Sequence, residues 1–339
     1  MQIKLRLIVI AETIVLALLL AYVGYILFHE PAQQIQPKYE LQKTGLLSPR
    51  VYAGLLKPKS FLISNFDPLR GRLEDYIKKY NLNVSIYVQN LRNGAEMEIN
   101  GNIGLFPASL NKLPIAVLVL QEIEKGRLNL NSKIHINDSD NNDPSSVLYG
   151  INQSDSTVKF LLEEMLKKSD NTAFYALLAK INKNDLAALL NYYDLDPEST
   201  YLLNKGVQDV KNVPNFVSPK DISNIFRSLY LSTVLEQNDS EYLLTLLTDT
   251  VFDIKRVAAL PENVIVSHKY GSFYGGEAKY FHDCGIIYLG ESRILYCIMT
   301  KDMDNKEAIL NTGIFVNAIY NFLNVTRTQM DVYKERGYI

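Results

Sequence analysis

The chain has 339 residues, 47% of them hydrophobic, and a formal net charge of −2. That length provides one large domain or two small ones with a sizeable core, and the balanced charge excludes the basic excess typical of nucleic-acid binding. The two cysteines and four scattered histidines exclude a disulfide-rich scaffold, a four-cysteine metal site and an HExxH zinc pair. We therefore expect neither a metal nor a cofactor.

The first 30 residues predict a membrane anchor. Lys4 and Arg6 precede an apolar stretch, residues 7–28, that is long enough to span a lipid bilayer. The positive-inside rule leaves the N-terminus in the cytoplasm and the rest of the chain outside, as a single-pass protein of the cell membrane. The alternative is a cleaved signal peptide, which is disfavoured because the stretch is long and no clear A-x-A site follows it.

Three segments are expected after this anchor at residues 1–30. Residues 31–60 hold several Pro, Gln and Lys residues with weak periodicity, which is typical of a linker. A small accessory element packed on the domain is the alternative for this segment. Residues 61–325 are predicted to form the globular domain, and residues 326–339 a polar C-terminal tail.

The globular domain has helical and strand patterns in a distinctive order. In chain order we expect a helix at 67–80, strands at 84–89 and 96–99, a mostly helical stretch at 109–249, strands at 264–269, 280–289 and 293–300, and a helix at 305–323. This order predicts an α/β (α+β) fold, in which helices flank a five-stranded antiparallel sheet and the central helices form a separate all-helical lobe.

The two cysteines, Cys284 and Cys297, lie on the last two predicted strands. They face each other if Gly290 and Glu291 form a two-residue turn. A cross-strand disulfide and a pair of free buried cysteines both remain open.

The first candidate catalytic motif is Ser109-Leu110-Asn111-Lys112, at the start of a long apolar helix. Positions i and i+3 share a helix face, so Lys112 can lie beside the Ser109 hydroxyl. A buried lysine can be neutral enough to take the serine proton, and this makes the serine a nucleophile. A second S-x-x-K match, Ser156 to Lys159, precedes an amphipathic helix and is interpreted as a helix cap.

The second motif, Ser169-Asp170-Asn171, lies in a short polar loop between two predicted helices. Ser169 can relay a proton to a leaving nitrogen, and Asn171 can bind a substrate amide. The alternative is a helix N-cap by Ser169 or Asp170. Another S-D-N match, at residues 139–141, has no apolar flank and is interpreted as a solvated turn.

The third motif is His268-Lys269-Tyr270-Gly271-Ser272, at the end of a predicted strand. Lys269 can place a positive charge near a substrate carboxylate, and Gly271 lets the backbone approach a ligand closely. The backbone N–H groups of Ser109 and Ser272 can form an oxyanion hole. The alternative is a strand that simply ends in a glycine turn.

The three motifs occur in the order S-x-x-K, S-D-N and K-x-G. With motifs in this order, the chain resembles the class A β-lactamases and penicillin-binding enzymes over about residues 61–323. The resemblance implies a helical lobe beside an α/β lobe, with the active site between them. The resemblance implies that Ser109 is the acylated nucleophile, that Lys112 is its base and that Ser169 relays a proton. It also implies that Asn171 contacts the substrate, and that the substrate carboxylate and the oxyanion are bound by Lys269, Gly271 and Ser272.

The chain departs from the family pattern in two places. Tyr270 stands where family members usually have Thr. The family's deacylating glutamate lies in an E-x-x-x-N pattern, which residues 194–218 do not contain. Asp196, Glu198 and Asp209 are the acidic residues considered, and Asp209, nearest the expected spacing, is the candidate deacylation base; the alternative is a surface acid.

The sequence thus predicts a membrane-anchored, extracytoplasmic serine hydrolase that forms an acyl-enzyme at Ser109 and acts on β-lactams. A penicillin-binding D,D-peptidase that acts on peptidoglycan peptides ending in D-Ala-D-Ala is the main alternative. A non-catalytic cell-wall-binding descendant and a plain esterase are the others. The expected partners are the substrate and, through residues 7–28, the lipid bilayer, with no nucleic acid.

Overall fold

The computed structural model describes residue 46 and residues 65–335, apart from 102, 141–142, 145, 152–153, 196–216 and 276–277. The predicted anchor at residues 1–30, nearly all of the predicted linker and Asp209 lie outside the described residues. Within them, one helical segment, Asn305–Val325, is long and apolar enough to cross a membrane. Half of that segment is buried inside the protein, as in the core helix of a folded domain.

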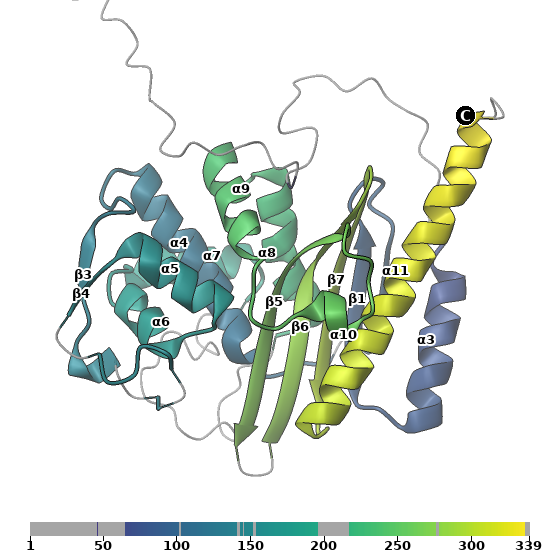
Figure 1. The fold of residues 1–339 in the computed structure, drawn as a ribbon, viewed down its shortest axis with the longest axis horizontal. Helices are drawn as coiled ribbons and strands as arrows, with labels where there is room; N and C mark the ends of the chain where they lie inside the picture. The colour runs from purple at the N-terminus through teal and green to yellow at the C-terminus, as the bar shows by residue number, and fades with distance from the viewer. Residues whose placement is uncertain are drawn as a thin grey trace, which may run out of the picture. The chain divides into compact units, whose positions relative to one another are not determined.

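Five antiparallel strands form the central sheet in the order β2-β1-β7-β6-β5 (Figure 1). The strands are β1 (Val84–Asn90), β2 (Glu96–Ile99), β5 (Ile265–Gly275), β6 (Ala278–Leu289) and β7 (Ser292–Lys301). All five lie where the sequence predicts strands, but β5 continues past its predicted end at residue 269. It continues because residues 270–275 pair with β6 along a long hairpin, despite the glycines Gly271 and Gly275.

The strand register answers the question that the sequence leaves open for the cysteines. Leu289 pairs with Ser292, so Gly290 and Glu291 form the predicted two-residue turn. Cys284 then lies directly opposite Cys297, and the two form a disulfide bond. This bond is fully buried, and Cys284 is also the cross-strand partner of Lys269.

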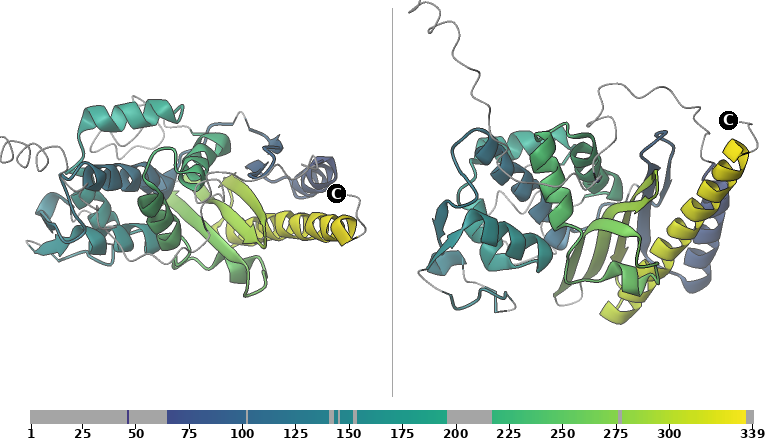
Figure 2. Two further views of the ribbon diagram at one scale, coloured as in Figure 1. Left: turned by 90° about the horizontal axis from the view of Figure 1, so that it is seen from above. Right: turned by 45° about the horizontal axis from the view of Figure 1, so that its top comes forward.

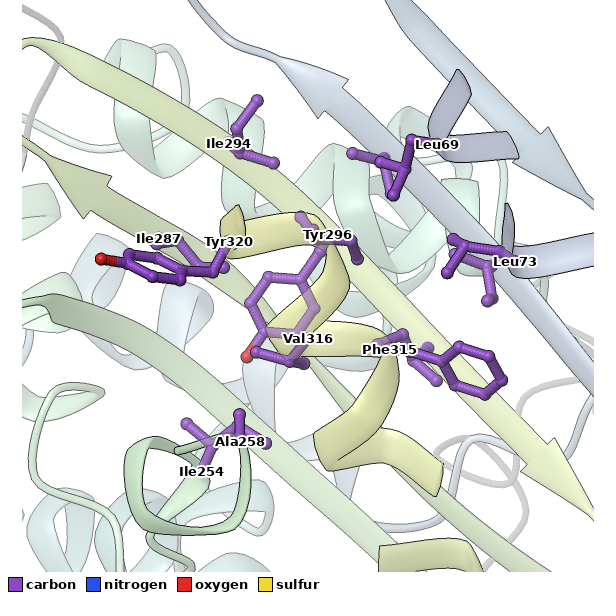
Figure 3. Close-up of a cluster of buried hydrophobic side chains, with 14 of the residues drawn as sticks. Leu69, Leu73, Ile254, Ala258, Ile287, Ile294, Tyr296, Phe315, Val316 and Tyr320 are labelled. Carbon is purple, nitrogen blue, oxygen red and sulfur yellow. The ribbon is translucent and has the colours of Figure 1, made fainter. Parts of the chain in front are cut away.

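Two long helices cover one face of the sheet. They are α3 (Asp67–Tyr80) and α11 (Asn305–Glu335), and the short helix α10 (Ile254–Val257) packs against α11. Figure 3 shows the resulting core, where Leu69 and Leu73 of α3 and Phe315 of α11 lie against apolar side chains of the strands. The predicted end of the last helix near residue 323 is wrong, because no glycine or proline interrupts residues 314–335 and the helix continues through the start of the predicted tail.

The helical lobe lies on the opposite side of the sheet from α3 and α11 (Figures 1 and 2). It contains η1 (Ala108–Asn111), α4 (Lys112–Glu124), η2 (Asp138–Asp140), α5 (Val158–Lys167), α6 (Asn171–Leu178), α7 (Lys183–Tyr192), α8 (Pro219–Leu231) and α9 (Gln237–Leu246). The sequence does not predict the small two-stranded sheet of β3 (Lys133–His135) and β4 (Asp155–Thr157), because its strands are too short for a periodic signal. Helix α8 packs against β1, β6 and β7 and so joins the lobe to the sheet.

Gly285, on β6, has no room for a side chain. A Cβ atom there would lie 2.6 Å from the Cβ atom of His268 and still closer to the Ser267 carbonyl oxygen. We expect Gly285→Ala to lower the free energy of unfolding by about 1–3 kcal/mol, because strand backbone must shift. Gly71→Ala, on the exposed face of α3 with nothing within 4 Å, is the matched control and should stabilise by about 0.5–1 kcal/mol. Equal midpoints for both variants in urea unfolding would contradict this account.

Candidate active site

Ser109 lies in η1, the single turn that leads into α4. Residues 113–120 of α4 are all buried, and Pro114 lies in the first turn, where its missing N–H costs little. Lys112 begins α4 and is only 2% exposed. Its Nζ lies 2.9 Å from the Ser109 Oγ, so the predicted i, i+3 pair is formed.

The segment Ser169-Asp170-Asn171 joins α5 to α6, as predicted. Asp170 is the N-cap of α6 and accepts a hydrogen bond from the Ala173 N–H at 2.8 Å. The cap interpretation is therefore correct for Asp170, while the residues on either side face Lys112. The Lys112 Nζ donates to the Ser169 carbonyl oxygen at 2.8 Å and to the Asn171 Oδ1, and it lies 3.3 Å from the Ser169 Oγ.

Lys269 of β5 reaches the same place from the sheet. It is fully buried, and its Nζ donates to the Ser169 Oγ at 2.9 Å and to the Tyr270 carbonyl oxygen at 2.8 Å. A continuous chain of contacts thus runs from the Ser109 hydroxyl through Lys112 and Ser169 to Lys269. Ser169 and Lys269 lie 100 positions apart along the chain, and β5 also packs against η1, which carries Ser109.

Gly271 is the point of closest approach between β5 and η1. A Cβ atom at this position would lie 3.0 Å from both the Pro107 carbonyl oxygen and the Ser109 nitrogen. Ser272 follows on the same strand and is exposed. The structure therefore brings the other predicted site residues together, whereas Ser272 is placed only by its position after Gly271 on β5, and Asp209 lies outside the described residues.

Burial controls the protonation of both lysines. Burial lowers the pKa of Lys112 to about 7, although the carboxylates of Asp170 and Asp143 oppose this shift. Burial and the neighbouring Lys112 both lower the pKa of Lys269 well below its usual range, against the opposing charge of Asp283. Near pH 7 the site can therefore hold a neutral amine beside the Ser109 hydroxyl.

Tyr270 covers Lys269. Its ring centroid lies 4.4 Å from the Lys269 Nζ, a cation–π distance. The same ring packs against Phe252, with centroids 5.4 Å apart, and burial raises the pKa of its phenol. The side chain that replaces the family's threonine thus packs beside the lysine amine.

Sequence reasoning missed the residues that hold the Ser169 loop. The Asn171 Nδ2 donates to Asp143, and the Asn171 N–H donates to the Ser146 Oγ at 3.0 Å. Asp170, predicted only as a possible cap, also accepts from the Leu148 N–H at 2.9 Å. Asp143 and Ser146 lie in or next to a polar stretch with no apolar periodicity, so no sequence signal distinguished them from surface residues.

A second buried network supports β5 from the opposite face of the sheet. The His268 Nδ1 lies 2.7 Å from the Asp283 Oδ2, and the Tyr296 hydroxyl donates to the other oxygen of Asp283 at 2.5 Å. The His268 Nε2 contacts the Thr250 hydroxyl at 2.9 Å. Among the described residues, no cluster of three His, Cys, Asp or Glu side chains could hold a metal ion.

The fold and the site together are those of one class of protein. In this class a helical lobe lies beside an antiparallel sheet, and the two bring together a serine and two buried lysines. The model of the β-lactamase enzyme family matches residues 68–323, and the chain belongs to this family. It is 24% identical to the β-lactamase VEB-1 of Pseudomonas aeruginosa over 242 residues, which are 68% of this chain and 81% of that protein. It is 26% identical to the extended-spectrum β-lactamase PER-1 of the same species over 207 residues, 57% of this chain and 67% of that protein.

Solved structures show the same fold. A β-lactamase from Chitinophaga pinensis superimposes with a TM-score of 0.66 at 21% identity, covering 75% of this chain and 99% of that one. The protein PBP-A superimposes with a TM-score of 0.66 at 20% identity, covering 77% of this chain and 99% of that one.

Proposed function

We propose that this protein is a serine hydrolase that forms an acyl-enzyme at Ser109 and acts on β-lactams. The observation that carries the proposal is the chain of contacts from the Ser109 hydroxyl through the Lys112 amine and the Ser169 hydroxyl to the Lys269 amine. Residues 1–30 would anchor the enzyme in the membrane, residues 31–60 would link the anchor to the domain, and the domain would lie outside the cell.

The proposed reaction begins with proton transfer from the Ser109 Oγ to the neutral Lys112 Nζ. The Ser109 oxygen then bonds to the lactam carbonyl carbon, and the N–H groups of Ser109 and Ser272 stabilise the oxyanion. As the carbon–nitrogen bond breaks, Ser169 gives its proton to the leaving nitrogen and receives one from Lys112. Lys269 orients the Ser169 hydroxyl, and Asn171 binds the substrate amide.

A penicillin-binding D,D-peptidase is the second candidate. It is favoured by the absence of an E-x-x-x-N pattern in residues 194–218 and by the similarity to PBP-A, a mutant of which has been solved as an acyl-enzyme complex with penicillin G. If Asp209 or another group does not activate water, the acyl-enzyme persists. The two candidates therefore differ in the lifetime of one covalent intermediate.

The first experiment treats the full chain in detergent with fluorescent penicillin. We expect one label per protein, attached to Ser109 and absent from Ser109→Ala. Ser156→Ala, which changes the other S-x-x-K match on β4, is the matched control and should label normally. Mass spectrometry over time then separates the candidates, because a β-lactamase loses the adduct by turnover whereas a peptidase retains it. A parent chain that shows neither an adduct at saturating reagent nor hydrolysis of the penicillin would refute the acyl-enzyme proposal.

The acylation rate should depend on pH through Lys112. The neutral amine is scarce below its pKa of about 7 and predominates above it, so the rate should rise with pH through about 7 and then level off. Asp143→Asn removes a negative charge that favours protonated Lys112 but keeps an oxygen that can accept from Asn171. In the Asp143→Asn variant, the rise of the acylation rate with pH should therefore occur at lower pH than in the parent. Stopped-flow labelling across pH measures the profiles of the parent and the variant. An acylation rate of the parent that does not change with pH would contradict the role of Lys112 as base.

Tyr270 should limit how well the site binds anionic substrates, because its ring packs beside the Lys269 Nζ, the amine proposed to face a substrate carboxylate. Tyr270→Thr should raise the rate of acylation by a penicillin at least about tenfold relative to the rate with its methyl ester. The threonine hydroxyl would donate one charge-assisted hydrogen bond of about 1.5 kcal/mol to the substrate carboxylate. Tyr274→Thr, on the same strand and 42% exposed, is the control and should change neither rate. Equal gains for acid and ester would refute this role.

A further inference from the structure

His282 is a buried histidine directly behind the Ser109 turn. It lies on β6 opposite Gly271 of β5, and its side chain is fully buried. Its Nε2 lies 2.7 Å from the carbonyl oxygen of Phe106. Because a carbonyl oxygen only accepts, this contact places the ring proton on Nε2. Burial lowers the pKa of His282 to about 4, although the backbone groups of Phe106 and Phe281 oppose the shift, so the ring is neutral at pH 7.

The other ring nitrogen of His282 indicates that this histidine does more than fill space in the core. Its Nδ1 is buried and, in the neutral ring with the proton on Nε2, has no donor partner among the residues that the structure describes, because the Phe281 backbone group stabilises only the protonated ring. A leucine or methionine would fill this space without leaving a buried nitrogen unpaired. The hydrogen bond that the ring makes goes to Phe106, three residues before Ser109.

The segment held by this hydrogen bond is strained. Ala108 has a φ of 49°, in the left-handed region that residues with a Cβ atom rarely adopt. Such a conformation persists only where the surrounding structure holds it. The Phe106 ring packs between Phe273 of β5 and Tyr280 of β6, with centroids 5.3 and 5.9 Å away. Side chain and carbonyl of Phe106 are thus both held by the β5–β6 hairpin.

The backbone beyond Phe106 is held from the same hairpin. Gly271, the cross-strand partner of His282, packs so closely that a Cβ atom would lie 3.0 Å from the Ser109 nitrogen. Any movement of the Phe106 carbonyl is passed through Pro107 and Ala108 to the Ser109 N–H and hydroxyl. These are the atoms that the proposed reaction requires in one position.

We propose that His282 is a positioning residue for acyl transfer: by donating from Nε2 to the Phe106 carbonyl, it holds the left-handed turn at Ala108 and so aligns Ser109 with Lys112. This inference rests on the proposed acyl-enzyme at Ser109. His282 does not touch the substrate; it acts through the backbone of residues 106–109.

The test compares His282→Gln, His282→Asn and His282→Leu in the full chain, with fluorescent penicillin as the probe. The glutamine Nε2 can reach the position of the histidine Nε2, whereas the asparagine amide is one methylene shorter. In the His282→Leu and His282→Asn variants we expect the acylation rate at saturating penicillin to fall by about tenfold to a hundredfold, because misplacing a reacting group by about 1 Å has effects of this size. The penicillin concentration that gives half of this rate should be unchanged. His282→Gln should stay within about threefold of the parent.

The Gln and Asn pair keeps the inference testable even if the Leu variant fails to fold, since both bury a neutral amide. Thermal unfolding of each variant is measured alongside. Equal rates for Gln and Asn, or rate losses that simply follow the fall in melting temperature, would overturn the positioning role. A parent chain that neither forms an adduct at Ser109 nor hydrolyses the penicillin would instead refute the acyl-enzyme proposal, and the role of His282 with it.

Discussion

The lysines Lys112 and Lys269 lie buried within hydrogen-bond reach of a single hydroxyl, that of Ser169. Two ammonium groups so close together and so far from water repel each other and lose hydration, and both effects favour loss of a proton. The carboxylates of Asp170, Asp143 and Asp283 offset part of this effect. Burial, opposed by Asp170 and Asp143, leaves Lys112 with a pKa of about 7, in the range that suits a general base, whereas the repulsion from Lys112 acts on the pKa of Lys269.

This arrangement requires a scaffold that holds strained backbone in place. Ala108 and Ser169 both have positive φ angles, at 49° and 59°, and each such residue costs about 1–3 kcal/mol. Buried packing of α4, the Asp170 cap on α6 and the β5–β6 hairpin hold these two residues from three directions. Ser169 thus lies in a short connection and Ser109 in a single turn, whereas Lys112 and Lys269 are placed by α4 and β5.

The local features of the chain were readable from the sequence because they depend on neighbours in the chain. The five strands and the helix at 67–80 follow from apolar periodicity, and the pairing of Ser109 with Lys112 follows from helix geometry. Periodicity failed where structure depends on distant partners. Strand β5 extends to Gly275 only because β6 pairs with it, and β3 and β4 are three residues each.

The sequence by itself determined the family and the identities of the three motifs, since their residue types, order and spacing are written in the chain. The tertiary structure decided what depends on through-space contact: that Cys284 and Cys297 are joined, that Asp143 supports Asn171 and that Tyr270 covers Lys269. It also placed His282 behind Ser109. No pattern along the chain encodes these contacts, because burial and distance between remote residues arise only when the lobe and the sheet pack together.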